Sequence, residues 1–189
     1  MAVWLDILGS MVFGSLLLLS VLRLTVDMSE RGTLATLAVV SQRQAAQIAG
    51  LLDTDLRRAG LGVAMPWTAV EVAEADSLRF AGDLDDDGTP DTLTYYLGPA
   101  TETAGTLNPR DRYLYRRLNS EAPLRVGEGL TAFTLRYYDA TGAELATPVP
   151  PGAVSQIAVQ YTVENPHSQD TTYARVPMEL RVVPANLNL

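Results

Sequence analysis

ILGSMVFGSLLLLSVL, residues 7–22, decides the fold, because this apolar run carries no charged side chain. Extended back to Val3, the run is about twenty residues long and contains a single charge, Asp6. That length suits a helix crossing a hydrocarbon core of about 30 Å. A secretory signal peptide would instead begin with basic residues, where Asp6 stands here. We therefore predict a retained membrane anchor, with a cleaved signal and a buried soluble helix as the alternatives.

The helical pattern continues beyond this apolar run. Between residues 23 and 60, apolar side chains recur every three or four positions, which is the spacing of an amphipathic helix. Since no Pro occurs before Pro66, we predict one helix over residues 3–59, about 85 Å long at roughly 1.5 Å per residue. Gly60 and Gly62 are expected to end it. The expected apolar face consists of Leu24, Met28, Leu34, Leu37, Val40, Ala45, Ile48, Leu51, Leu52 and Leu56.

The charge of Asp6 is unfavourable in an apolar segment and calls for an explanation. An acidic side chain costs about 2.5–3.5 kcal/mol near the bilayer centre and less near the end of a helix. One interpretation places Asp6 at the membrane interface, hydrated or capping the helix. The other gives it a functional role, in which it neutralises a positive group on a neighbouring subunit when helices bundle together.

After Pro66 the periodicity changes to that of strands bounded by turn residues. Apolar and polar residues alternate, which suits an antiparallel sheet with one covered face. We therefore predict an α+β fold with a transmembrane or filament-core helix (1–24), an amphipathic continuation that covers the sheet (25–60), and a β-rich head (61–189). The predicted strands are residues 77–80, 92–97, 113–118, 130–138, 154–163 and 173–183.

Composition limits the classes of function. The chain of 189 residues suits one core-bearing domain, and the absence of Cys excludes disulfides and thiolate chemistry. The charges of residues 1–60 balance, so the formal net charge of −8 falls on residues 61–189. Because phosphate contacts need clustered positive charge, we do not expect nucleic acid as the main partner.

The sequence offers little for catalysis. The only His, His167, lies in a polar loop and is predicted to be a solvated surface residue. With no Cys and no Gly-rich phosphate loop, we do not expect an enzyme. The neighbours Tyr95 and Tyr96, like Arg116 and Arg117, are expected to lie on opposite faces of a strand as ordinary sheet residues.

The strongest local motif is DLDDDGTPD, residues 83–91. Its oxygen donors at alternate positions, with a Gly at the sixth, resemble the first nine residues of an EF-hand-type calcium loop. The twelfth position is Thr94 rather than a bidentate Glu, and the loop lies between predicted strands. A structural calcium site and an acidic solvated turn are therefore both open. The candidate ligands are Asp83, Asp85, Asp87, the backbone carbonyl of Thr89, and Asp91.

Four segments, taken in order behind the anchor helix, resemble the type IV pilin superfamily, and most of all its PilW-type minor pilins and J-type pseudopilins. The resemblance implies a filament subunit that is first a single-pass membrane protein and then part of an extracellular filament at the cell surface. It implies other pilins and an inner-membrane assembly machinery as partners. The segments are DLRRAG (55–60), FAGDLDDDGTPDTLTYY (80–96), YLYRR (113–117) and GEGLTAFTLRY (127–137).

The resemblance also assigns Asp6 to the acidic residue near the start of the mature chain, which pairs with a neighbour's N-terminal amine in that family. Counting from Ala2, Asp6 is the fifth residue, although the family usually has Glu there and a short leader ending in Gly before the helix. We therefore expect either a processed chain or a different maturation, such as loss of Met1.

Two other classes of function are compatible with the sequence. The first is a monomeric single-pass membrane protein whose head binds a ligand or partner outside the membrane. The second is a cell-envelope hydrolase that uses pairs of Asp or Glu. No motif in the sequence supports this second class.

Overall fold

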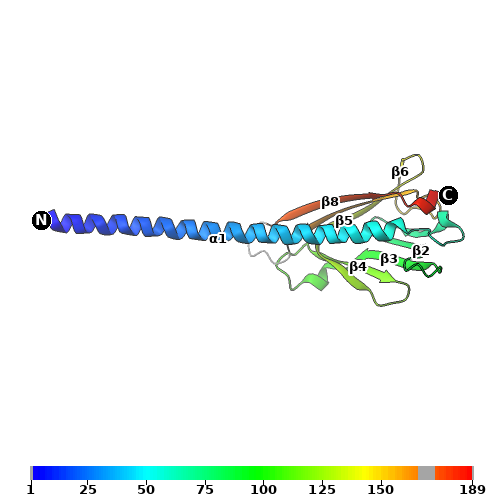
Figure 1. The fold of residues 1–189 in the computed structure, drawn as a ribbon, viewed down its shortest axis with the longest axis horizontal. Coiled ribbons are helices and arrows are strands. Elements are labelled where there is room, and N and C mark those ends of the chain that lie inside the picture. Colours follow the sequence, from blue (N-terminus) through cyan, green and yellow to red (C-terminus); the bar gives the residue numbers. More distant parts are fainter. Residues whose placement is uncertain (1, 166–172, 189) are drawn as a thin grey trace.

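A single long helix runs through the molecule. The structure is a computed structural model that describes residues 2–165 and 173–188. The helix α1 (Ala2–Arg57) is continuous, and its N-terminal part projects far beyond the head, with the two chain ends at opposite extremes of the molecule (Figure 1). The predicted continuous helix is confirmed, and it ends two residues earlier than expected.

The two glycines predicted to end the helix lie just beyond its last residue. Gly60 and Gly62 both have positive φ, +82° and +70°, a conformation that Gly adopts without a steric cost. Just before them, the amide of Ala59 donates to the carbonyl of Leu56, which tightens the last turn. The amide of Gly60 then donates to the carbonyl of Ala81, so the end of the helix is bonded directly to the sheet.

The described residues after α1 form one antiparallel sheet with short 3₁₀ helices at its margins. Its strand order is β1-β2-β3-β4-β5-β7-β8, with β6 paired to β5, so the predicted α+β class and antiparallel pairing are confirmed. The strands are β1 (Val70–Ala73), β2 (Ser77–Gly82), β3 (Asp91–Leu97), β4 (Arg112–Leu118), β5 (Leu124–Tyr138), β6 (Glu144–Leu145), β7 (Gln156–Glu164) and β8 (Arg175–Val182). The 3₁₀ helices are η1 (Pro66–Thr68), η2 (Ala100–Thr103) and η3 (Ala185–Asn188).

Two short strands and the first part of a long one were not predicted. The strands β1 and β6 are too short to show a clear alternation. The long strand β5 was predicted to begin at residue 130, yet it begins at Leu124 and runs through Gly127 and Gly129. Gly127 lies under α1, because a Cβ there would be 2.8 Å from Cδ1 of Ile48. This Gly therefore permits close approach of helix and strand and does not end the strand.

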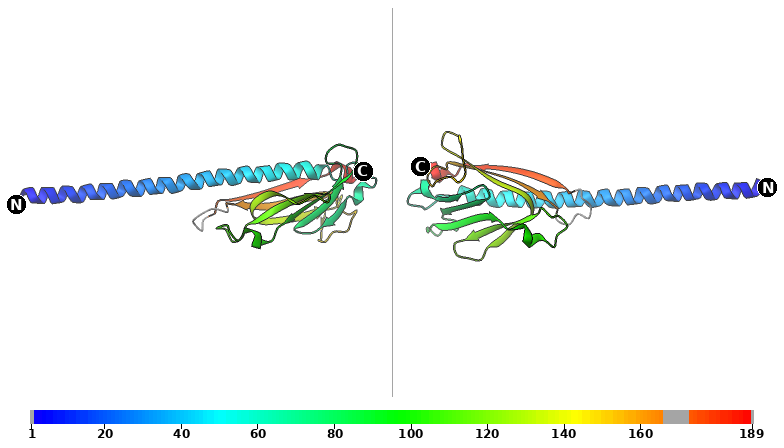
Figure 2. Two further views of the ribbon diagram at one scale, coloured as in Figure 1. Left: turned by 90° about the horizontal axis from the view of Figure 1, so that it is seen from below. Right: turned by 180° about the vertical axis from the view of Figure 1, so that it is seen from behind.

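The core lies between the sheet and the C-terminal part of α1. Figure 2 shows the sheet lying along one side of this part of the helix. Four helix residues with nearly no exposed surface form a stripe at three- and four-residue spacing, which we call the packing stripe. The hydroxyl of Tyr161 on β7 donates to the carbonyl of Ala45 at 2.6 Å, and burial raises the pKa of Tyr161 to about 12. The packing stripe consists of Ala45, Ile48, Leu52 and Leu56.

The expected apolar face of the helix extends further towards the N-terminus than the head does. Met28 and Val40 are both more than half exposed, so the prediction that the apolar face of residues 25–60 covers the sheet over its whole length is wrong. The periodicity was real, but it shows only that one face is apolar and not what covers that face. Among the described side chains of α1, the first buried one is Ser41.

The close contact between Gly82 of β2 and the end of the helix can be tested by substitution. A Cβ at Gly82 would lie 2.3 Å from the backbone carbonyl oxygen of Arg58, a contact that neither backbone can avoid without moving. We therefore expect Gly82→Ala to lower the free energy of unfolding by about 1–3 kcal/mol. The measurement is thermal or urea unfolding of the full chain in detergent, followed by circular dichroism.

Gly50→Ala is the matched control. Gly50 is on the exposed side of α1, where a Cβ meets no atom within 4 Å. Because Ala favours the helix over Gly, this variant should gain about 0.5–1 kcal/mol. Equal stability of Gly82→Ala and the wild type would show that the helix end and β2 are not packed this closely.

Candidate functional site

The first candidate site is the exposed apolar part of α1. The segment Ile7–Ser29 is long and apolar enough to cross a membrane, and none of it is buried inside the molecule. Three of its hydroxyl groups are satisfied within the helix: Ser15, Ser20 and Thr25 donate to carbonyls three or four residues earlier, at 2.8–2.9 Å. Such internal bonding lets a polar side chain enter an apolar environment without an unmet hydrogen bond.

The exposed part of the helix is longer than a membrane requires. Residues 30–40 add about 16 Å of helix, at roughly 1.5 Å per residue, between the apolar segment and the first buried side chain. This stretch also exposes apolar groups, with Val39 and Val40 each more than half exposed. A bilayer core of about 30 Å would already be spanned by Ile7–Ser29, so it would leave this second stretch uncovered.

Two residues singled out in the sequence lie at the limits of the structure. Asp6 belongs to α1 and immediately precedes the apolar segment. Its pairing with a neighbouring subunit stays a prediction. His167 lies outside the described residues.

The second candidate site is the loop between β2 and β3. One carboxylate oxygen from each of Asp83, Asp85 and Asp87 lies within 4.8 Å of the other two, so the loop brings together three of the predicted ligands. Asp83 is buried at the base, whereas Asp85 and Asp87 are exposed. Gly88 has a φ of +86°, which produces the sharp turn expected at the sixth position of a calcium loop.

Backbone amides hold the three carboxylates in place. The amide of Gly88 donates to Oδ2 of Asp83 at 3.0 Å, and the amides of Asp87 and Thr89 donate to Oδ1 of Asp85 and Asp87 at 3.2 and 2.7 Å. The remaining oxygen of Asp83, Oδ1, is buried and has no hydrogen-bond partner in the described part of the chain. Each carboxylate thus has one oxygen fixed by the loop.

Asp91 does not join this group. Its Oδ1 accepts a hydrogen bond from Nδ2 of Asn119 at 2.7 Å, and its Oδ2 accepts one from the amide of Leu84 at 3.4 Å. Asp91 therefore closes the loop at its far end. Thr94, at the twelfth position, lies within β3, where it pairs with residues of β2 and β4.

Arg58 joins the loop to the end of α1. Its guanidinium donates to the carbonyls of Asp83 and Leu84 at 3.3 and 3.1 Å. It also makes two hydrogen bonds of 2.9 Å to the carboxylate of Asp86, a bidentate ion pair. Within the loop, Asp86 is therefore the carboxylate that forms the ion pair with Arg58.

A buried polar cluster lies between helix and sheet, and the sequence analysis did not connect its members. Asp55 on α1 accepts a hydrogen bond from Nε of Arg116 on β4 at 2.7 Å and one from the hydroxyl of Tyr95 on β3 at 2.6 Å. Burial and the nearby Asp55 carboxylate raise the pKa of Tyr95 far above its usual value of 10, so this hydroxyl stays a donor. The available signal was the position of Asp55 between Leu52 and Leu56, on the buried side of the helix.

The adjacent pairs divide between the two sheet faces as predicted. Tyr95 is fully buried and bonds to the helix, whereas Tyr96 is half-buried and stacks on Tyr115 with the ring centres 5.4 Å apart. Arg116 likewise reaches Asp55 on the helix side.

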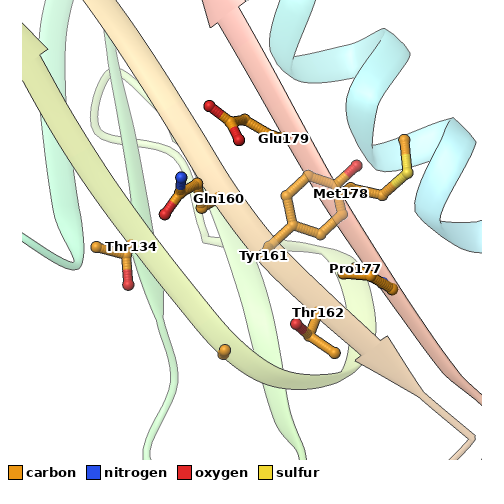
Figure 3. Close-up of a pocket in the computed structure, with 8 residues that line it drawn as sticks. Thr134, Gln160, Tyr161, Thr162, Pro177, Met178 and Glu179 are labelled. Carbon is orange, nitrogen blue, oxygen red and sulfur yellow. The ribbon is translucent and has the colours of Figure 1, made fainter.

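A hollow of about 400 Å³ lies across β5, β7 and β8. Figure 3 shows Thr134 and Gln160 from the first two strands and Glu179 from the third among its lining residues. Two-carboxylate hydrolysis needs a second acid a few ångströms away, and Glu179 is the single carboxylate among the residues that line this hollow. We assign no chemistry to it.

No protein-family model matches the chain, and no curated protein is significantly similar to it. The geometry of the two candidate sites and the motifs of the sequence are therefore the observations that bear on function.

The polar cluster generates a second prediction. Asp55→Ala removes the acceptor of both Arg116 and Tyr95 and leaves a mostly buried guanidinium without its counter-charge. Breaking such a pair from one side costs about 3–5 kcal/mol when both groups are buried. Since Arg116 retains some exposure, we expect a loss of about 3 kcal/mol in the free energy of unfolding, measured by urea titration.

Tyr95→Phe is the control for this prediction. It removes one hydrogen bond to Asp55 and leaves the ion pair in place, so the expected loss is about 1 kcal/mol. If Asp55→Ala lost no more stability than Tyr95→Phe, the ion pair would not contribute to the contact between helix and sheet.

Proposed function

We propose that this protein is a structural subunit of an extracellular filament of the type IV pilus or type II secretion kind, which assembles through its N-terminal helix. The observation that carries the proposal is the exposed apolar surface of α1, which consists of the segment Ile7–Ser29 with Val3 and Trp4 before it, and of Val39 and Val40 beyond it. Among the described side chains of α1, none before Ser41 is buried by the head, so the apolar part of the helix needs cover from outside the subunit.

Two successive environments supply that cover. Before assembly, a lipid bilayer covers Ile7–Ser29, whose 23 residues correspond to about 34 Å of helix. In the filament, the helices of other copies or of other pilins cover the same surface. They also cover residues 30–40, which a bilayer would leave in water. The greater length of the exposed apolar surface favours a helical bundle over a simple anchor.

The sequence motifs support the same assignment. The four segments that resemble PilW-type minor pilins and J-type pseudopilins cover the end of α1, the β2–β3 loop with parts of its flanking strands, most of β4 and most of β5. On this proposal, an inner-membrane machinery moves the subunit from the membrane into the filament, and a minor or tip-proximal position suits the resemblance. Asp6 then neutralises the N-terminal amine of a neighbouring subunit within the apolar bundle.

A monomeric single-pass membrane protein is the competing function. It accounts for Ile7–Ser29 and gives no reason for the apolar groups at Val39 and Val40. The two functions differ in whether residue 39 is covered in the native state, which makes that position the best place for a test.

Removal of the acid tests the role of Asp6. Because Asp6→Asn deletes the charge and eases partition into lipid, we expect normal membrane insertion with filament incorporation reduced about tenfold, equivalent to about 1.4 kcal/mol per contact. The comparison is between sheared filaments and the membrane fraction, quantified by immunoblot. Asp27→Asn makes the same change at the other end of the apolar segment and should assemble normally. Normal assembly by Asp6→Asn would rule out the pairing.

Site-specific labelling tests the helical bundle. Because the chain contains no Cys, Val39→Cys provides a single thiol on the exposed helix, about 15 Å beyond Ser29. In cells that assemble the native structure, we expect a bulky water-soluble maleimide to label this thiol at least tenfold more slowly than in detergent. Ala140→Cys, on an exposed turn of the head, should react equally in both conditions.

The same samples are then imaged by electron microscopy. Filaments together with a protected residue 39 support the proposal. Rapid labelling of Val39→Cys in the native membrane, with detergent-solubilised monomers as the only particles, would assign the chain to the monomeric class.

A further inference from the structure

The β2–β3 loop concentrates negative charge around a buried oxygen atom. Asp83, Asp85 and Asp87 present carboxylate oxygens within 4.8 Å of one another, on a chain whose net charge is already −8. The basic group that reaches this loop, Arg58, makes its ion pair with Asp86. The other three carboxylates lie close together, and their hydrogen bonds come from loop amides rather than from a basic side chain, an arrangement that a bound cation would stabilise.

The second observation is independent of this clustering. Asp83 is 8% exposed, and its Oδ1 is buried without a hydrogen-bond partner in the described part of the chain. A buried carboxylate oxygen is costly when nothing replaces its lost water, so such atoms are normally bonded or bind a metal. The amide of Gly88 already holds Oδ2 of the same carboxylate, so Oδ1 is the atom that lacks a ligand.

We infer that residues 83–91 bind one calcium ion, with Asp83, Asp85 and Asp87 as side-chain ligands and the backbone carbonyl of Thr89 as a fourth. All these groups supply oxygen, which is the ligand of hard cations rather than of zinc or copper. Asp85 and Asp87 each have one oxygen fixed by a loop amide and a second one left to bind. Asp91 keeps its bonds to Asn119 and Leu84 and is not a direct ligand.

The ion has a structural role at the junction of helix and head. Arg58, near the end of α1, is bonded to the carbonyls of Asp83 and Leu84, and the amide of Asp83 donates to the carbonyl of Leu61 at 2.8 Å. Fixing the carboxylate of Asp83 therefore also fixes the backbone that holds the helix end. This inference does not depend on filament assembly, because the loop and the helix end belong to one subunit.

Calcium titration of the purified full chain in detergent tests the site. Because calcium binds the folded state, a hundredfold excess over Kd should raise the melting temperature by about 5–10 °C relative to chelator at matched ionic strength. Calorimetry should give one ion per chain, with a Kd in the range of extracellular sites, about 0.1–1 mM, because Thr94 does not provide the bidentate ligand of a tighter loop. Magnesium should give a smaller shift, since it requires tight octahedral geometry.

Substitutions within the loop separate a site from an acidic turn. Asp85→Asn and Asp87→Asn keep the oxygens that accept the loop amides but remove the charge, and each should abolish most of the calcium shift. Asp86→Asn removes an equal charge that is paired with Arg58, and it should keep the shift. Equal melting temperatures in calcium and chelator, or an equal loss in all three variants, would overturn the inference. An equal shift with magnesium would do so as well.

Discussion

The whole arrangement depends on the burial of one stripe of α1 against the sheet. The packing stripe of Ala45, Ile48, Leu52 and Leu56 carries the head, and no disulfide supplements it in the described chain. A charged residue, Asp55, is buried next to this stripe, and Arg116 on the sheet neutralises it. Towards the N-terminus the backbone remains helical, but none of the segment Ile7–Ser29 is buried inside the molecule. One continuous helix is therefore packed against the sheet at one end and exposed at the other.

The parts of the fold that were predicted are those whose signals are local in the sequence. The apolar run and the periodicity after it predicted the helix, and Gly60 and Gly62 predicted its end within two residues. Alternation within single segments predicted the six longer strands. The first part of β5 was missed because Gly127 is indistinguishable from a turn residue until Ile48 is known to lie above it. The extent of helix covered by the head was overestimated for a similar reason, because sequence spacing does not identify the covering surface.

In the candidate sites, too, the sequence predicted only what local spacing determines. Spacing within residues 83–91 correctly brought together Asp83, Asp85 and Asp87, whereas the position of Asp91 depends on Asn119, a residue on another turn that no local motif includes. The cluster of Asp55, Tyr95 and Arg116 joins three separate elements, so only their assembly reveals it. An acidic residue at a buried helical position could have indicated that a basic partner was needed, but not which Arg supplies it.

The side-by-side contact of α1 and the sheet has a mechanical consequence. The head lies along the helix rather than at its tip, and the long axis of the contact is parallel to the helix (Figure 2). A tension applied along the helix axis therefore loads the packing stripe in shear, so that Ala45, Ile48, Leu52 and Leu56 share the force. A sideways pull on the head would instead peel these contacts apart one after another, beginning at Ser41 or at the Arg58 end. The contact between helix and sheet therefore resists a force along the helix axis better than a force across it.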